Sequence, residues 1–154
     1  MKDKVYIIDF GTILKYKDNN GFLLSEKGSS FVGTMLYASI NVHNYDTCSM
    51  REDLESLGYC LLGLLCQNKG YWFEKKELDH KYFIKAKEDF IYAHDVDPRV
   101  KGIQLYLQQV RTLAFQQVPD YDSLKTLVGD FSYGMKALQT KILDKYAQSI
   151  LEET

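Results

Sequence analysis

Residues 49–66, Ser-Met-Arg-Glu-Asp-Leu-Glu-Ser-Leu-Gly-Tyr-Cys-Leu-Leu-Gly-Leu-Leu-Cys, decide the fold of this chain. Ser49 and Glu52 have the spacing of a capping box, in which the N-cap and N3 residues satisfy each other's free amides. No charged residue occurs from 56 to 67, and apolar side chains occupy every face of the predicted helix. A helix that is apolar all round is a buried helix. The stretch therefore predicts a central helix around which the other elements pack.

Size, charge and cysteine usage exclude several classes of protein. A chain of 154 residues is long enough for one domain with a substantial core. Its net charge of −2 gives no electrostatic footprint for nucleic acid, and the uncharged run 56–67 is shorter than the roughly 20 residues that span a bilayer. Three cysteines without a CxxC pair, and no signal peptide, indicate reduced thiols in an intracellular protein, cytoplasmic or nuclear. We therefore expect neither nucleic acid nor a membrane as a partner.

The chain before the central helix is expected to contain short strands. Lys4–Asp9 is rich in β-formers and predicts a strand. Thr12–Tyr16 predicts a second short strand, and Phe22–Leu24 the strand that returns from it. The segment 17–21 between them ends in Asn-Gly, the preferred centre of a tight hairpin. Ser39 is placed to cap a short helix.

The chain after the central helix is expected to be helical. Tyr71–Phe73 contains the only tryptophan and is interpreted as a packing anchor. The segment 77–93 has the apolar stripe of a surface helix, formed by Leu78, Tyr82, Ala86, Phe90 and Ala93. Pro98 stands at an allowed position at the start of the next helix. Pro119-Asp120 begins another helix.

The last helical pattern is weakened at Gly129 and Gly134, where we expect a break before a terminal helix from about Met135. Its apolar stripe is interpreted as core, with a docking face for a partner helix as the alternative. Cys60 and Cys66 are expected to be small core residues. The chain as a whole predicts a single α-rich α+β domain over 1–154, with a short β-hairpin region followed by four to five helices around the buried central helix.

Several stretches, taken in order, closely resemble the C-terminal lobe of casein kinase 1-type protein kinases. They are Val5–Gly11, Gly33-Thr34, Tyr37–Asn41, Arg51–Tyr59, Arg111–Phe115 and Pro119–Tyr121. Leu57–Cys60 and His43-Asn44 also look like the related vaccinia-related kinases. The resemblance covers roughly 4–131 and leaves 132–154 as a C-terminal helical extension. It implies a protein-kinase-like C-lobe.

The resemblance implies roles at the nucleotide site. Asp9 would be the aspartate that brings Mg²⁺ to the ATP phosphates, and Phe10 would pack to set the active or inactive arrangement. Together with Gly11 they would form the remnant of a nucleotide site.

The resemblance also implies substrate-facing and structural residues. Gly33, Thr34, Tyr37 and Ser39 would lie at the substrate-facing end of the activation segment. Asp53 would be the buried acid of the central helix that anchors the backbone of the catalytic loop. Arg51 and Arg111 would be structural or anion-facing arginines.

The parts of a kinase that precede Asp-Phe-Gly are not in these 154 residues, because that motif begins at Asp9. They include the Gly-rich loop, the lysine of the third strand and the His-Arg-Asp catalytic loop. No catalytic set is therefore complete, and Mg²⁺ and ATP are expected to bind tightly only in a complete kinase. Leu36 and Met50 also stand where the family usually has arginines, which puts recognition of acidic substrates in doubt.

Three interpretations remain open. The chain is the C-lobe of a longer casein kinase 1-like serine/threonine kinase, or a natural truncated pseudokinase that acts as a protein-binding module. The third is a regulatory subunit that docks on a full kinase or on itself. For the third interpretation, the missing N-lobe should leave an apolar face around Phe10 and the first strand, where a protein partner would dock.

Overall fold

The computed structural model describes residues 8, 10–13, 15, 19, 30–76 and 79–129. Within these residues the chain is helical and contains no strand. The elements are η1 (Phe10–Thr12), α1 (Ile40–His43), α2 (Met50–Cys66), α3 (His80–Tyr92), η2 (Pro98–Val100), α4 (Lys101–Arg111) and α5 (Tyr121–Gly129). None of these helices combines the length and the hydrophobicity needed to cross a membrane.

The predicted β region lies almost entirely outside the described residues. This applies to the strands 4–9 and 22–24 and to the hairpin turn between 17 and 21, of which only Asn19 is described. The expected strand from Thr12 is wrong at its first residue, because Thr12 ends the 3-10 turn η1. The predicted terminal helix from Met135 also lies outside the described residues.

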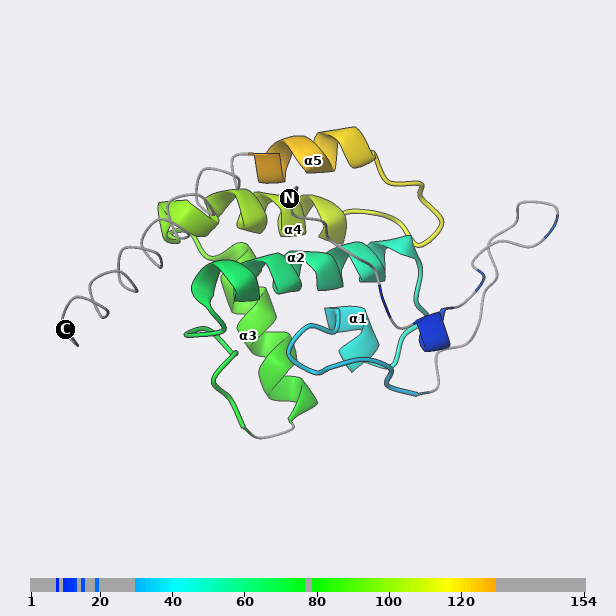
Figure 1. Cartoon of the computed structure of the whole chain (residues 1–154), viewed down its shortest axis with the longest axis horizontal. Helices are drawn as coiled ribbons and strands as arrows, with labels where there is room; N and C mark the ends of the chain where they lie inside the picture. Colours follow the sequence, from blue (N-terminus) through cyan, green and yellow to red (C-terminus); the bar gives the residue numbers. More distant parts are fainter. Residues whose placement is uncertain are drawn as a thin grey trace, which may run out of the picture.

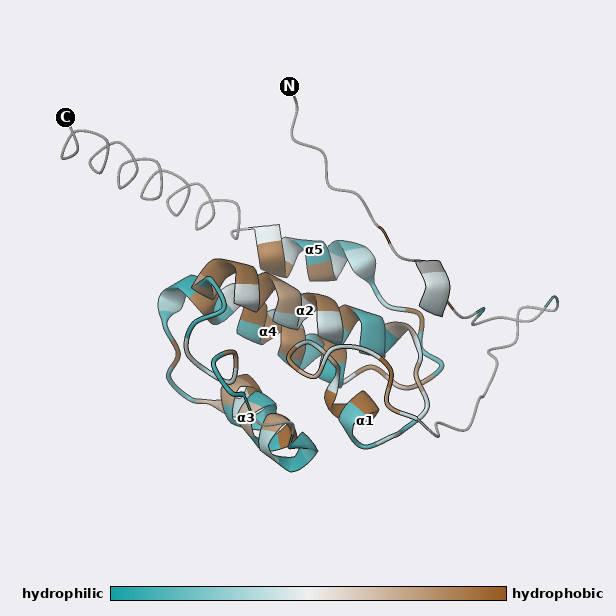
Figure 2. Ribbon diagram, turned by 60° about the horizontal axis from the view of Figure 1, so that its bottom comes forward, coloured by the Kyte–Doolittle hydropathy of each residue, from teal (hydrophilic) through white to brown (hydrophobic). Residues whose placement is uncertain are grey.

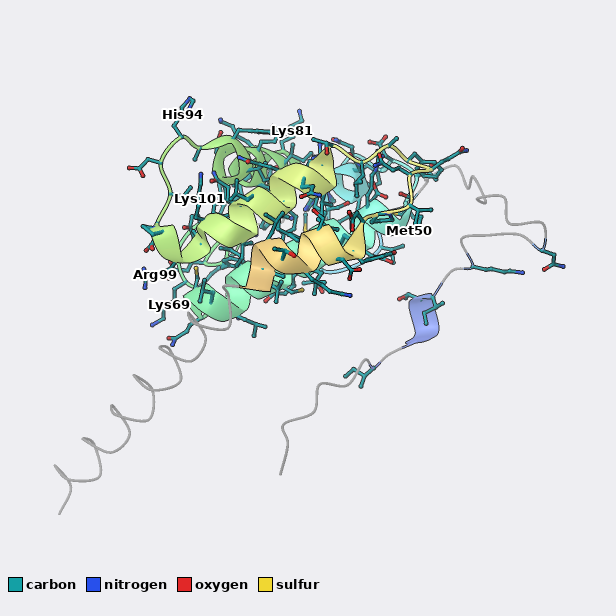
Figure 3. All side chains as sticks on the ribbon, turned by 90° about the horizontal axis from the view of Figure 1, so that it is seen from above. Met50, Lys69, Lys81, His94, Arg99 and Lys101 are labelled. Carbon is teal, nitrogen blue, oxygen red and sulfur yellow. The ribbon has the colours of Figure 1, made fainter. Side chains whose placement is uncertain are left out.

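The predicted central helix is confirmed as α2, and it begins as its sequence indicates. The Glu52 carboxylate accepts hydrogen bonds from the Ser49 amide (2.5 Å) and the Ser49 hydroxyl (2.9 Å). Figure 1 shows α2 across the middle of the molecule, with α4 and α5 on one side and α1 and α3 on the other. In Figure 3 Met50 marks one end, and Lys69, Arg99 and Lys101 gather at the opposite end, so α2 and α4 run antiparallel.

The core lies between α2, α3 and α4. Its large buried side chains are Tyr59, Leu62, Trp72, Phe83, Phe90, Ile91, Ile103 and Leu107. Trp72 is 0% exposed, and its indole N–H donates to the Leu36 carbonyl at 2.8 Å. The predicted packing anchor is confirmed for Trp72 and Phe73, whereas Tyr71 is largely exposed.

Several helix starts are confirmed. Ser39 caps α1, since its hydroxyl accepts from the Val42 amide at 3.1 Å. Pro98 occupies the first turn of η2, and the Asp120 carboxylate accepts from the Ser123 amide at the start of α5. Helix α3 begins at His80, later than the predicted start at 77, because the Asp79 carboxylate caps it.

The expectation that α2 is buried on every face is wrong. Leu57 is 49% exposed and Leu64 is 59% exposed, and Cys60 and Cys66 are only partly buried. The other described helices cover only part of the circumference of α2, although Figure 2 shows that much of the helix is hydrophobic. This uncovered side, with Asp53, Leu57 and Leu64, is called the open face of α2 below.

Gly58 sets how closely α2 approaches α4. A Cβ at Gly58 would lie 2.6 Å from Cδ2 of Leu107 and 3.0 Å from Cε1 of Tyr106. Both neighbours are buried. The two helices therefore pack at a distance that only glycine permits here.

We predict that Gly58→Ala lowers the free energy of unfolding by about 1–2 kcal/mol, because overpacking outweighs the gain in helix propensity. Urea denaturation followed by circular dichroism measures the change. Gly129→Ala is the matched control, since a Cβ there meets nothing within 4 Å. Equal effects of the two substitutions would contradict this account of the α2–α4 contact.

Candidate functional site

The segment expected to face substrate forms a tight turn ahead of α1. Gly33 has φ of +121°, a backbone conformation that favours glycine. The Thr34 carbonyl then accepts from the amides of Tyr37 and Ala38, both at 2.9 Å. The turn from Thr34 to Ala38, called the 34–38 turn below, leads directly into the cap of α1.

The side chains of the predicted substrate-facing residues do not all face outward. Gly33 and Thr34 are exposed. Tyr37 is partly buried, and its hydroxyl donates to Asn68 Oδ1 at 3.0 Å. Ser39 is 0% exposed, because its hydroxyl is used in the α1 cap. The exposed part of this segment is therefore Gly33-Thr34, and Ser39 has a structural role in it.

The 34–38 turn is held from the inside by a lysine of α3. Lys87 is 0% exposed, and its ammonium donates to the carbonyls of Met35 (2.9 Å) and Ala38 (2.7 Å). The same nitrogen lies 2.9 Å from Nε2 of His43 in α1. It also lies over the rings of Tyr59, Phe83 and Trp72, at 4.8, 5.5 and 5.7 Å from their centroids. No carboxylate is within hydrogen-bonding distance among these contacts.

A buried carboxylate of α2 joins three helices next to this turn. Glu55 Oε1 accepts from the Ile40 amide at 2.8 Å and from the Tyr59 hydroxyl at 2.7 Å. Its second oxygen accepts from Arg111 Nη1 of α4 at 3.2 Å. Burial and the charge of Glu55 raise the pKa of Tyr59 well above its usual value, so Tyr59 remains a hydrogen-bond donor. Burial opposes the charge of Arg111, but the partner Glu55 raises its pKa overall.

A second buried carboxylate extends the network to the start of α2. Asn41 bridges the two acids, since its Oδ1 accepts from Arg111 at 3.1 Å and its Nδ2 donates to Glu52 at 2.7 Å. Arg51 donates to Glu52 at 2.6 Å and to the Leu113 carbonyl at 3.1 Å. Arg51 and Arg111 are thus both paired with glutamates in this network, which favours the structural alternative for the two arginines.

Asp53, expected to be buried, is exposed in this chain. No hydrogen bond among the described residues involves its carboxylate. It lies on the open face of α2, one turn before Leu57. The role that the resemblance implies for Asp53, accepting hydrogen bonds from the backbone of a catalytic loop, stays a prediction.

The nucleotide-site residues are barely described. Asp9 and the side chain of Phe10 lie outside the described residues, and Gly11 is exposed. The described ranges contain no group of three or more His, Cys, Asp or Glu side chains able to hold a metal ion. The role of Asp9 in holding Mg²⁺ stays a prediction.

Glu55, Lys87 and His43 are the residues that sequence reasoning missed. Each is a polar residue in a helix, and amphipathic patterns place such residues on the solvent side. The one available signal lay in α3, where Lys87 follows Phe83 by four residues and precedes Ile91 by four. That spacing puts the lysine in the middle of an apolar stripe.

We predict that neutralising one acid of α2 lowers the free energy of unfolding strongly, whereas neutralising another changes it little. Glu55→Gln should lower the free energy of unfolding by about 3 kcal/mol, because it removes the charge of a buried carboxylate and leaves the partly buried Arg111 without its counter-charge. Asp53→Asn, the matched control two residues earlier, should change it by less than about 1 kcal/mol, the size of a first-turn dipole effect. Thermal and urea unfolding of both variants provide the comparison. A large loss for Asp53→Asn would show that its carboxylate already has a structural partner in this chain.

The sequence of this chain is similar to proteins that are named as protein kinases. No family model matches the chain. It is 35% identical to a protein of Fowlpox virus (strain NVSL) named "probable serine/threonine-protein kinase", over 81% of this chain and 43% of that protein. It is 31% identical to a protein of Encephalitozoon cuniculi (strain GB-M1) named "probable casein kinase I homolog", over 89% of this chain and 45% of that protein.

The chain spans less than half the length of these curated relatives. The two relatives bear out the kinase-like resemblance of the sequence, and the all-helical described part agrees with a kinase C-lobe at a coarse level. By sequence, the chain therefore has a kinase-like relationship to these two proteins.

Proposed function

We propose that this chain is the C-terminal lobe of a casein kinase 1-like serine/threonine kinase. It would support phosphoryl transfer only when an N-lobe and a catalytic loop are supplied, and it would be inactive alone. The observation that carries the proposal is the open face of α2, where the exposed carboxylate of Asp53 lies one turn before the half-exposed Leu57 and on the same side as Leu64. Because the chain matches under half the length of its relatives, the remaining half of such a kinase would be available to cover this face.

The open face has the chemistry of an internal surface. Leu57 and Leu64 are two turns apart on one side of α2 and are each about half exposed. Burying a leucine side chain fully is worth about 2 kcal/mol, so covering this face would be favourable. Asp53 would then accept hydrogen bonds from backbone amides of the covering segment. This is the role that the resemblance assigns to it toward the catalytic loop.

The 34–38 turn supports the proposal from the substrate side. By resemblance, Gly33 and Thr34 belong to the end of the activation segment that meets the protein substrate. In this chain the turn is already held by Lys87, by Trp72 and by its own hydrogen bonds. A substrate platform that is formed before the other lobe arrives would lose little entropy on assembly.

Inactivity of the chain alone follows from the chemistry of phosphoryl transfer. That reaction is catalysed by positioning and charge stabilisation, for which Mg²⁺ neutralises charge on the phosphates. Asp9 would hold the metal ion, but one carboxylate does not form a site for Mg·ATP. The base, the second metal ligand and the lysine would come from the remainder of the kinase.

The second candidate is a pseudokinase that acts as a binding module. The same open face favours it, because an apolar surface that is not covered by the chain itself marks a protein interaction site. In that case the covering partner is a different protein, a full kinase or a second copy of this chain. The two candidates differ in whether the covered assembly transfers phosphate.

A reconstitution experiment tests the proposal. The chain is co-purified with the part of the fowlpox virus relative that lies outside the matched region, and transfer of labelled phosphate from ATP to casein is measured. We predict no transfer by the chain alone and measurable transfer by the assembled halves. Asp9→Asn should abolish the transfer without preventing assembly.

The variant Leu57→Lys tests whether assembly uses the open face. It should prevent co-purification, whereas Leu105→Lys, on an exposed position of α4, should not. Phosphate transfer by the isolated chain would overturn the predicted inactivity. Assembly that Leu57→Lys leaves intact would show that the open face is not the contact, and assembly without transfer would favour the binding module.

A further inference from the structure

Two basic side chains share the buried space beneath the 34–38 turn. Nζ of Lys87 and Nε2 of His43 are 2.9 Å apart, and His43 is 1% exposed. Nδ1 of His43 lies 3.0 Å from Nδ1 of His80, and Nε2 of His80 lies 3.3 Å from the Tyr45 hydroxyl. The described contacts thus form a chain from a fully buried lysine to the partly exposed His80 and the exposed Tyr45.

The hydrogen-bond count determines which atoms carry protons. A charged Lys87 has three N–H groups, and three acceptors surround it: the carbonyls of Met35 and Ala38, and His43 Nε2. Nε2 of His43 also lies 3.0 Å from the Met35 carbonyl. When charged Lys87 donates to His43 Nε2, the proton of neutral His43 lies on Nδ1 and is donated to His80 Nδ1. When Lys87 is neutral, a proton on His43 Nε2 faces the Lys87 lone pair and the Met35 carbonyl. The first arrangement carries one proton more than the second, and both leave the N–H groups of Lys87 hydrogen-bonded.

A second proton on the pair is disfavoured by charge repulsion, although the Met35 carbonyl can accept the N–H of a protonated His43 Nε2. With both bases protonated, two cations would lie 2.9 Å apart, on a lysine that is 0% exposed and a histidine that is 1% exposed. The Coulomb repulsion of such a contact is large in a buried site. Moving the turn away from α3 would relieve it, because both cations would then reach water.

We propose that Lys87 and His43 form a pH-sensitive latch, which keeps the 34–38 turn closed on α3 while at most one of the two bases is charged and opens it when both are charged. The turn is the element that gives way, since Lys87 holds it by two carbonyls and residues 34–37 are exposed or only partly buried. The latch depends only on contacts within this chain. Its effect on a substrate would rest on the proposed function.

The charged and titratable groups around the pair come from every neighbouring element. Glu55 and Tyr59 face it from α2, and His80 faces it from the start of α3. The charge of Glu55 favours protonated Lys87, but Glu55 is already paired with Arg111 of α4. It therefore does not provide a full counter-charge for a second proton.

The direction of the pH dependence follows from the two bases. Burial lowers the pKa of Lys87 from 10.5 to about 7, and burial together with the charge of Lys87 lowers the pKa of His43 from 6.5 to about 4. The open or unfolded chain thus binds more protons than the closed form from 10.5 to 7 and again from 6.5 to 4. Both groups make the closed turn less stable as pH falls, by up to about tenfold per pH unit for each proton.

Trp72 is a built-in reporter for the test. It is the only tryptophan of the chain, it is 0% exposed, and its indole N–H donates to the Leu36 carbonyl within the turn. We predict that its emission shifts to the red between pH 6.5 and 4, before the helical circular dichroism of α2 and α4 is lost. Over the same range the amides of Tyr37 and Ala38 should lose protection from hydrogen exchange by up to about tenfold per pH unit.

Two variants and a control decide the outcome. His43→Gln should remove the step between pH 6.5 and 4, because the amide does not titrate. Lys87→Met should open the turn across the whole pH range, because the carbonyls of Met35 and Ala38 lose their donor. Lys85→Met, an exposed lysine of the same helix paired with Asp89, should behave like the wild type. The latch is refuted if Trp72 emission changes only together with helix unfolding, or if Lys87→Met follows the wild-type profile.

Discussion

The carboxylate of Glu55 is the interaction on which the rest of the structure depends. It lies inside the molecule and accepts hydrogen bonds from the Ile40 amide, the Tyr59 hydroxyl and Arg111. A buried charge without partners costs several kcal/mol, so α1, α2 and α4 are held in the one arrangement that satisfies it. The position of α1 in turn sets the place of the 34–38 turn that precedes it. One acid of the central helix thereby positions the segment that the resemblance assigns to substrate.

Helix α2 has two different sides, and this asymmetry connects the fold with the proposed function. One side carries Glu55, Tyr59 and Leu62 in the core. The other side presents Asp53, Leu57 and Leu64 to water. Helix α2 thus has a complete core on one side and an uncovered apolar face on the other. This is the arrangement expected of a lobe that packs against a second lobe. The relatives, which are more than twice as long as the matched region, contain enough further chain for that second lobe.

The turn over α3 is held differently from the rest of the core. Its carbonyls are bound by a buried lysine that lies on three aromatic rings and faces a histidine. Hydrophobic packing depends little on pH, whereas two bases in contact respond directly to proton concentration. The same fold therefore combines a pH-insensitive frame of helices with one contact able to respond to acid.

The sequence by itself determined where α1, α2, η2 and α5 begin. The capping box of Ser49 and Glu52, the cap at Ser39 and the starts at Pro98 and Asp120 are local, because each depends on residues within one turn. The kinase resemblance was also available from the sequence. Only the tertiary structure decided which side of α2 is covered, since a helical period shows which residues share a face and not whether that face meets a neighbour. It likewise decided the burial of Lys87 and the pairing of Glu55 with Arg111, because partners 56 residues apart in sequence are brought together only by packing.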